Sequence, residues 1–189
     1  SVTYSIAFSD SAGNAGTAVT SGTGSVTFDK TAPTLSSVGI ASNNSTTTLA
    51  KASNVVTLTF TASETIATPV VTFQSGGAAI TASVTHVNTS GNIWTAAYTA
   101  NASDTDGSVT YSIAFSDSAG NAGTAVTSGG GSVTFDKTAP TVSSVSTTAD
   151  NQSSVSITDN ITVTFSEAME PSYVTTTTTD TTCRAETIK

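Results

Sequence analysis

The sequence predicts an all-β protein, built from antiparallel β-sandwiches that are repeated in tandem. Three observations support this fold class. Thr and Ser are abundant, with 41 Thr and 30 Ser among 189 residues, whereas only 10% of the residues are charged. Apolar and polar residues alternate along several short segments, as they do in strands with one buried face. Finally, one long segment occurs twice with almost no change.

The duplicated segment sets the length of the repeating unit. Residues 1–34 and 108–141 are identical at 33 of 34 positions, and the exception is Thr23 against Gly130. The two copies are offset by 107 residues, which is a typical domain length. We therefore expect tandem domains of about this size.

These boundaries divide the chain into three parts. Residues 34–140 are predicted to form one complete domain. Residues 1–33 would be the C-terminal part, the last two strands, of a preceding repeat. Residues 141–189 would be the N-terminal part of a following, diverged repeat, in which Ser166-Glu167 resembles Ser63-Glu64.

Seven strands are predicted within the complete domain. Each is a short run that favours strand and is bounded by Gly, Asn, Asp or Ser. The predicted strands are Leu35–Ala41, Val55–Ala62, Val70–Gln74, Ala79–Val87, Ile93–Thr99, Val109–Ser116 and Thr124–Phe135, the last with an interruption at Gly129–Gly131. Seven short strands in about 100 residues are typical of an immunoglobulin-like sandwich. Trp94 is expected in its core.

The charge balance excludes several kinds of partner. Lys and Arg together number 5 and Asp and Glu number 13, so the formal net charge is −8. Nucleic-acid binding is excluded because it depends on basic residues that neutralise phosphates. No apolar run is long enough to span a bilayer, so we expect no membrane insertion. A single His86 and a single Cys183, which is expected to be inert, leave little for catalysis, so no enzyme is predicted.

Two motifs resemble the bacterial Ig-like tandem repeats of large secreted and cell-surface adhesins. The first pairs Ser116–Asn121 with Phe135–Thr141, and it recurs at Asp10–Asn14 and Phe28–Thr34. The second, Val163–Pro171, resembles the second-strand region of another bacterial Ig-like subfamily. The resemblance implies an extracellular, bacterial cell-surface location and a stalk that carries a binding domain towards a host or surface ligand. It also implies calcium ions at domain junctions.

The residues themselves favour a non-catalytic spacer. Each domain can bury its own core, and Pro140 restricts the short linker to extended geometry. The expected partners are neighbouring Ig-like repeats of the same chain. An alternative is a subunit of an extracellular filament or surface layer, in which residues 1–33 of one chain complete residues 141–189 of the next, end to end. A carbohydrate-binding sandwich is a third possibility, which lacks a cluster of exposed aromatic residues.

The scarce carboxylates are predicted to gather at the two poles of the sandwich. In an antiparallel sandwich, alternate loops lie at opposite poles. The N-terminal pole, where the incoming linker joins, should therefore collect Asp29, Glu64, Asp117 and Asn121. Because Ca²⁺ takes six to eight oxygen ligands, including carboxylates and amide carbonyls, these residues are predicted to bind one Ca²⁺.

A second Ca²⁺ is predicted at the C-terminal pole. Its expected ligands are Asp104, Asp106 and Asp136, together with Glu167 from the next repeat. The alternative at both poles is turn chemistry alone. In that case Asp104, Asp106 and Asp117 only accept hydrogen bonds from the backbone of their own turns.

Overall fold

The computed structural model describes residues 2–147 and 161–169, and these residues form strands and loops. The chain divides into two compact units, residues 1–137 and 138–189. Within the described ranges there is no helix long and apolar enough to cross a membrane. Cys183 lies outside the described residues.

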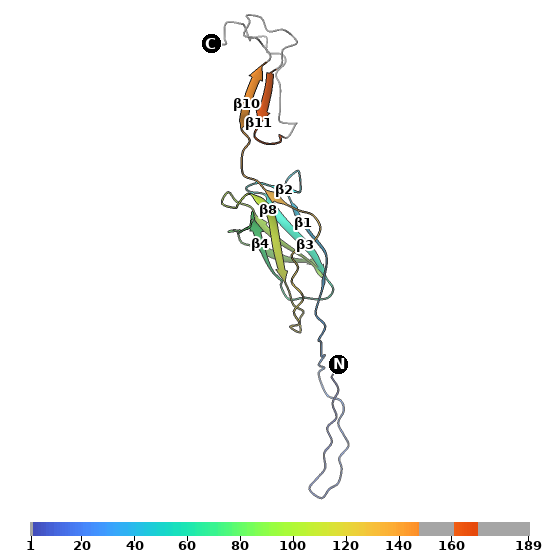
Figure 1. Ribbon diagram of the computed structural model, residues 1–189. Helices are drawn as coiled ribbons and strands as arrows, with labels where there is room; N and C mark the ends of the chain where they lie inside the picture. Colours follow the sequence, from blue (N-terminus) through green and yellow to red (C-terminus); the bar gives the residue numbers. More distant parts are fainter. Residues whose placement is uncertain (1, 148–160, 170–189) are drawn as a thin grey trace, which may run out of the picture. The chain divides into compact units, whose positions relative to one another are not determined.

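The first unit contains a two-layer β-sandwich, which confirms the predicted all-β, immunoglobulin-like fold class. Its strands are β1 (Leu35–Ser42), β2 (Leu49–Ala50), β3 (Val55–Ala62), β4 (Val70–Ser75), β5 (Ala78–Ala79), β6 (Thr85–Ser90), β7 (Ile93–Thr99), β8 (Gly107–Ala114) and β9 (Thr134–Phe135). One layer has the order β1-β3-β7-β6 and the other has the order β2-β9-β8-β4-β5. Figure 1 labels β1 and β3 of the first layer and β2, β4 and β8 of the second. Neighbouring strands are antiparallel, except that β2 and β9 run parallel.

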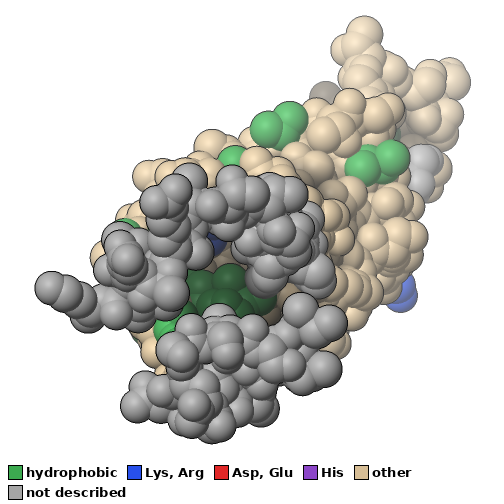
Figure 2. All heavy atoms as spheres, turned by 90° about the horizontal axis from the view of Figure 1, so that it is seen from above, with side chains coloured by type: hydrophobic (Ala, Val, Ile, Leu, Met, Phe, Trp, Pro, Cys, Tyr) green, Lys and Arg blue, Asp and Glu red, His purple; other side chains and the backbone are tan. Residues whose placement is uncertain are grey.

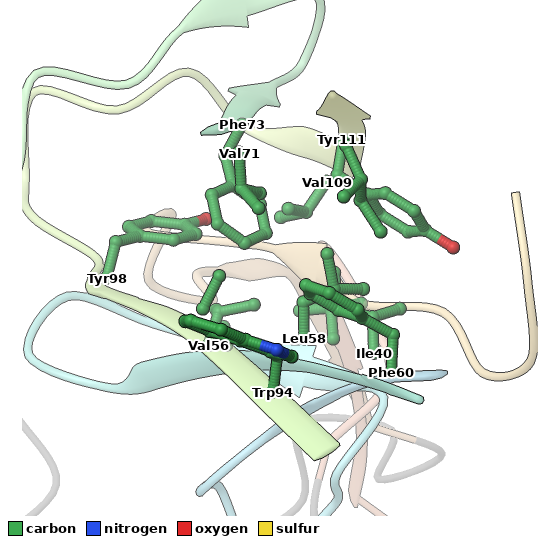
Figure 3. Close-up of a cluster of buried hydrophobic side chains, with 14 of the residues drawn as sticks. Ile40, Val56, Leu58, Phe60, Val71, Phe73, Trp94, Tyr98, Val109 and Tyr111 are labelled. Carbon is green, nitrogen blue, oxygen red and sulfur yellow. The ribbon is translucent and has the colours of Figure 1, made fainter. Parts of the chain in front are cut away.

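Strict alternation along the strands builds the core between these layers. In β3, Val56, Leu58 and Phe60 are fully buried, while the residues between them face away from the core. Phe73 of β4 approaches this row from the opposite layer (Figure 3). Trp94 of β7 is also buried in the core, as the sequence predicts. Each such side chain contributes about 1.5–3 kcal/mol when it is fully buried.

One predicted strand is wrong in its extent. Ala79–Val87 forms no single strand, because β5 pairs with β4 in one layer and β6 pairs with β7 in the other. The chain crosses between the layers over residues 80–84, where Ile80, Ala82 and Val84 pack against the core. The crossing keeps the apolar alternation of a strand, so the local pattern does not reveal it.

The last predicted strand is also shorter than expected. Of Thr124–Phe135, only β9 is a regular strand, and the preceding residues make isolated bridges. Val126 pairs with Ile113 of β8, whereas Gly130 pairs in parallel with Gly39 of β1. The segment therefore leaves one layer for the other at its glycines. A Cβ at position 131 would lie only 2.3 Å from the carbonyl oxygen of Ile40, so the close approach requires glycine.

The second unit repeats the beginning of the first. Its strands β10 (Val142–Thr147) and β11 (Ile161–Phe165) pair antiparallel, with a register shift near the start of β10, as β1 and β3 do. Ser166 N donates to Thr141 O, and Thr141 N donates to Ser166 Oγ, both at 2.9 Å. Thr34 and Ser63 make the same reciprocal pair at 3.0 and 2.9 Å. We call each such pair a Thr–Ser clasp.

Candidate metal centre

Asp117 sits in a tight turn that follows β8. Its Oδ1 accepts a hydrogen bond from Asn121 N at 2.8 Å, and its Oδ2 accepts one from Asn121 Nδ2 at 2.7 Å. Gly120 closes the turn with a φ of +96°, a conformation that suits glycine. The Asn121 side chain, followed by backbone N–H groups of the turn, lowers the pKa of Asp117 below its ordinary value of 3.8, although burial opposes this. The carboxyl group is therefore ionised at neutral pH.

The same turn forms at the corresponding position of the first copy. Asp10 accepts hydrogen bonds from Asn14 N and Asn14 Nδ2, both at 2.8 Å. These bonds lower the pKa of Asp10 as well, the Asn14 side chain having the largest effect. The same turn forms around the exposed Asp10 and around the buried Asp117, so its formation depends on the local sequence and not on the surrounding sandwich. Turn chemistry therefore operates at Asp117, whatever else this carboxylate binds.

The incoming linker is held against this turn. Asn121 Nδ2 also donates to the carbonyl oxygen of Asp29 at 3.3 Å, so one amide contacts the turn and the linker together. Pro33 is fully buried, and the Thr34–Ser63 clasp follows it directly. Glu64 comes next after the clasp, which fixes its position beside the linker.

These contacts bring three predicted ligands together. Carboxylate oxygens of Asp29, Glu64 and Asp117 all lie within 4.8 Å of one another, and this is the close acidic group found among the described residues. Asp29 and Glu64 are half-buried and Asp117 is buried. The group borders a depression of about 530 Å³ lined by Thr27, Asp29, Glu64, Thr65, Asp117, Ser118 and Ala119.

The geometry of the group suits a calcium ion. Ligand oxygens at about 2.4 Å from Ca²⁺ can be at most about 4.8 Å apart, and the three carboxylates satisfy this limit. Three carboxylates at this separation repel one another unless a cation neutralises them. The hydroxyl groups of Thr27, Thr65 and Ser118 border the same depression and could complete an oxygen shell. The sequence did not single out these three residues, because hydroxyl side chains occur throughout it.

The C-terminal pole is built differently. Asp104 is buried, and its Oδ2 accepts a hydrogen bond from Asn101 N at 3.0 Å. Asp106 Oδ1 accepts one from Lys137 N at 2.9 Å. The Lys137 ammonium group donates to the backbone oxygens of Asp104 and Ala102 at 2.7 and 3.2 Å. A lysine therefore ties the outgoing linker to this loop, a role that the sequence analysis did not anticipate for Lys137.

The second predicted calcium site stays a prediction. Among the described residues, Asp104, Asp106 and Asp136 do not form a close group of the kind seen at the N-terminal pole. Asp136 is exposed, and Glu167 belongs to the second unit. The duplication makes Asp136 the counterpart of Asp29, and the repeated clasp makes Glu167 the counterpart of Glu64.

Comparison with known proteins gives a family match for the second unit and its linker. Residues 136–189 match the family model of a bacterial Ig-like domain, whose members are generally non-catalytic structural domains of bacterial surface and extracellular proteins. No curated protein and no solved structure matches the chain. The matched segment includes β10, β11 and the Thr141–Ser166 clasp, which reproduce the start of the first unit. Residues 136–189 are therefore similar in sequence to a bacterial Ig-like domain.

Proposed function

We propose that this chain is a non-catalytic spacer of a bacterial surface protein, in which tandem Ig-like domains set the reach of a stalk. The observation that carries the proposal is that residues 34–137 enclose a complete core while their two linkers join at opposite poles. A domain of this kind adds length without needing a partner for its own folding. The near-identity of residues 1–34 and 108–141 supports a tandem arrangement of such domains.

The linkers support this role because they are anchored to the sandwich. At the N-terminal pole, Pro33 is buried and the carbonyl group of Asp29 is held by Asn121. At the C-terminal pole, both the backbone and the side chain of Lys137 are bonded to loop residues. Anchored linkers restrict how neighbouring domains rotate, so a stalk built in this way resists bending.

The surface also suits a spacer. Where described residues are visible in Figure 2, the surface consists mainly of backbone and uncharged polar side chains, with scattered hydrophobic groups. The net charge of −8 keeps such chains apart in solution. Bacterial surface or extracellular location follows as part of the proposal, in line with the family match.

We further propose that Ca²⁺ stiffens the N-terminal junction by binding Asp29, Glu64 and Asp117. The three carboxylates come from the linker, from the loop after β3 and from the turn after β8. An ion held by all three would fasten the linker to two loops of the sandwich. The close grouping of these oxygens supports the proposal.

Calorimetric titration and thermal melting of the full chain, with Ca²⁺ and with a chelator, test the calcium site. We expect binding of one Ca²⁺ at this junction and a higher melting temperature in its presence. Asp117→Asn should abolish this binding. Asp10→Asn is the matched control, because it changes the same turn away from the acidic group, and it should leave binding intact. Equal behaviour of the two variants would remove calcium from the proposal.

Trypsin digestion tests the anchored linker. Lys30 lies in the incoming linker and Lys137 in the outgoing one, and both are potential cleavage sites. Cleavage after Lys30 should be slow in the folded chain, slower still with Ca²⁺, and faster in Asn121→Ala, which loses the bond to Asp29. Cleavage after Lys137 serves as the internal control and should not respond to Ca²⁺ at the N-terminal pole. Rapid cleavage after Lys30 under all conditions would contradict a stiff junction.

A further inference from the structure

The one histidine of the sequence, His86, joins the two layers of the sandwich. Its Nε2 accepts a hydrogen bond from Val71 N at 3.3 Å. Val71 belongs to β4 in one layer, whereas His86 belongs to β6 in the other layer. In the strand order of their layers, β6 stands last and β4 is followed only by the two-residue β5. The bond therefore closes the side of the sandwich between β4 and β6, which we call the seam.

The pairing of β4 directs the Val71 N–H into the seam. Ile113 of β8 and Val126 donate to each other's carbonyl oxygens at 2.9 and 3.1 Å. Val71 lies opposite Ile113, so in the antiparallel pattern its N–H points away from β8. The short β5 pairs with Gln74 and Ser75 and does not reach Val71. The imidazole of β6 thus provides an acceptor where a longer neighbouring strand would provide a carbonyl group.

The pairing of β6 directs the His86 side chain towards the same place. His86 lies opposite Ala96 of β7, which is fully buried in the core. Directly opposite residues share a face of the sheet, so the imidazole points inward between the layers. His86 itself is half-buried, at the edge where the chain crosses between the layers over residues 80–84. Strand pairing on both sides therefore fixes the geometry of this bond.

Only a neutral imidazole can make this hydrogen bond. Nε2 accepts when it carries no proton and the ring hydrogen is on Nδ1, whereas both nitrogens donate in the protonated ring. Protonation would therefore turn an N–H of His86 towards the N–H of Val71, a residue that is only 4% exposed. Histidine ordinarily changes charge between about pH 5 and 8. Because the folded seam holds the neutral form, its stabilising effect is present at the upper end of this range and is lost as the pH falls.

The strands around the seam contain no charge that would compensate an imidazolium. β4, β6, β7 and residues 80–84 contain no Asp, Glu, Lys or Arg. Tyr98 of β7 is titratable, but burial and, to a smaller extent, the Asp104 charge raise its pKa to about 12, so it stays neutral below pH 8. The flanking carboxylates, Glu64 before β4 and Asp104 after β7, belong to loops at the two poles.

We infer that His86 is a pH-sensitive latch, which holds the seam closed while it is neutral and releases it on protonation. The inference goes beyond the spacer function and does not depend on calcium. Release separates β6 from β4 and leaves the strand pairs within each layer intact. A stalk of such domains would therefore be stiffer in neutral than in mildly acidic surroundings.

Amide hydrogen exchange, followed by NMR on the full chain with a chelator present, tests the latch directly. Protection factors correct for the effect of pH on the intrinsic exchange rate, and they are compared at about pH 7.5 and about pH 5.5. Protection of the Val71 amide should fall by about tenfold at the lower pH, as expected for one lost hydrogen bond. The Ile113 amide is the internal control, because it bonds to Val126 O in the same layer and should keep its protection.

Two variants show whether the imidazole causes the change. His86→Gln offers a side-chain oxygen as acceptor and does not titrate, so its Val71 protection and its melting temperature should be the same at both pH values. His86→Phe fills the seam without an acceptor, so its Val71 protection should be low at both. The unmodified chain alone should melt at a lower temperature at the lower pH. The inference is overturned if His86→Gln responds to pH as the unmodified chain does, or if Val71 and Ile113 lose equal protection in the unmodified chain.

Discussion

The truncations Phe28→Ala and Phe135→Ala measure how far burial alone determines the contribution of a side chain to the free energy of unfolding. Phe28 and Phe135 occupy equivalent positions in the duplicated sequence, each followed by Asp-Lys-Thr-Ala-Pro-Thr. Phe135 is 1% exposed and Phe28 is 74% exposed. Truncating a buried Phe to Ala removes its transfer free energy and leaves a cavity, and such changes typically cost about 3–5 kcal/mol. An exposed truncation usually changes stability by less than about 0.5 kcal/mol.

These magnitudes give a large difference in melting temperature. In a domain of about 100 residues, each kcal/mol lowers the midpoint by about 4–8 °C. Phe135→Ala should therefore melt at least about 12 °C below the unmodified chain, whereas Phe28→Ala should melt within a few degrees of it. Trp94 fluorescence is the suitable probe, because it reports the core of the sandwich and not residues 2–28.

Equal losses from the two truncations would refute the reasoning. A small loss for Phe135→Ala would mean that Phe135 contributes little to the core. A large loss for Phe28→Ala would mean that Phe28 packs against the rest of the chain.

Three further predictions concern pH and backbone geometry. Because the pKa of Asp117 is lowered in the folded chain, its contribution to stability is present above about pH 4 and is lost as pH falls through the folded-state pKa. Asp117→Asn should therefore make the melting temperature of the sandwich depend less on pH in the acid range, whereas Asp10→Asn should not change this dependence. Burial, with a smaller effect of the Asp104 charge, raises the pKa of Tyr98 from 10.0 to about 12, so stability should fall between these pH values and Tyr98→Phe should remove that fall in alkaline melts. Gly131 has a φ of +75°, and the methyl group of Gly131→Ala would clash with the Ile40 carbonyl oxygen, so this variant should have a lower melting temperature. Gly24 has a φ of +91°, but a Cβ there would meet no atom within 4 Å, so Gly24→Ala should leave the melting temperature of the sandwich unchanged.

The sequence predicts the regular strands of this fold well, because one face of each is buried. The bounds of β3 and β7 match the alternating patterns of their residues. β2 was missed because it has only two residues and depends on a parallel partner far along the chain. The crossing between β5 and β6 was missed because Ile80, Ala82 and Val84 keep a strand-like pattern while they leave one layer for the other.

The candidate site was predictable in part, because the order of strands along the chain determines which loops lie at the same pole. Alternation of loops between poles correctly placed Asp29, Glu64 and Asp117 together. It did not reveal that Asn121 holds both the turn and the linker, which depends on side-chain reach. It also did not reveal that Lys137 bonds the loop at the opposite pole.

The parallel contact between the first and last segments of the sandwich determines how a pulled domain would resist force. Gly130 exchanges hydrogen bonds with Val38 and Ile40, and Asp136 N bonds Ala50 O at 2.8 Å. Because the two segments run parallel and the chain leaves them at opposite poles, tension loads these bonds in shear, and they must fail together. Residues 2–28 pair with one another in antiparallel fashion, as Ile6 does with Val19, so tension on the two ends of this hairpin would open its bonds one at a time. The duplicated sequence therefore yields a strong mechanical element where it completes a sandwich and a weak one where it does not.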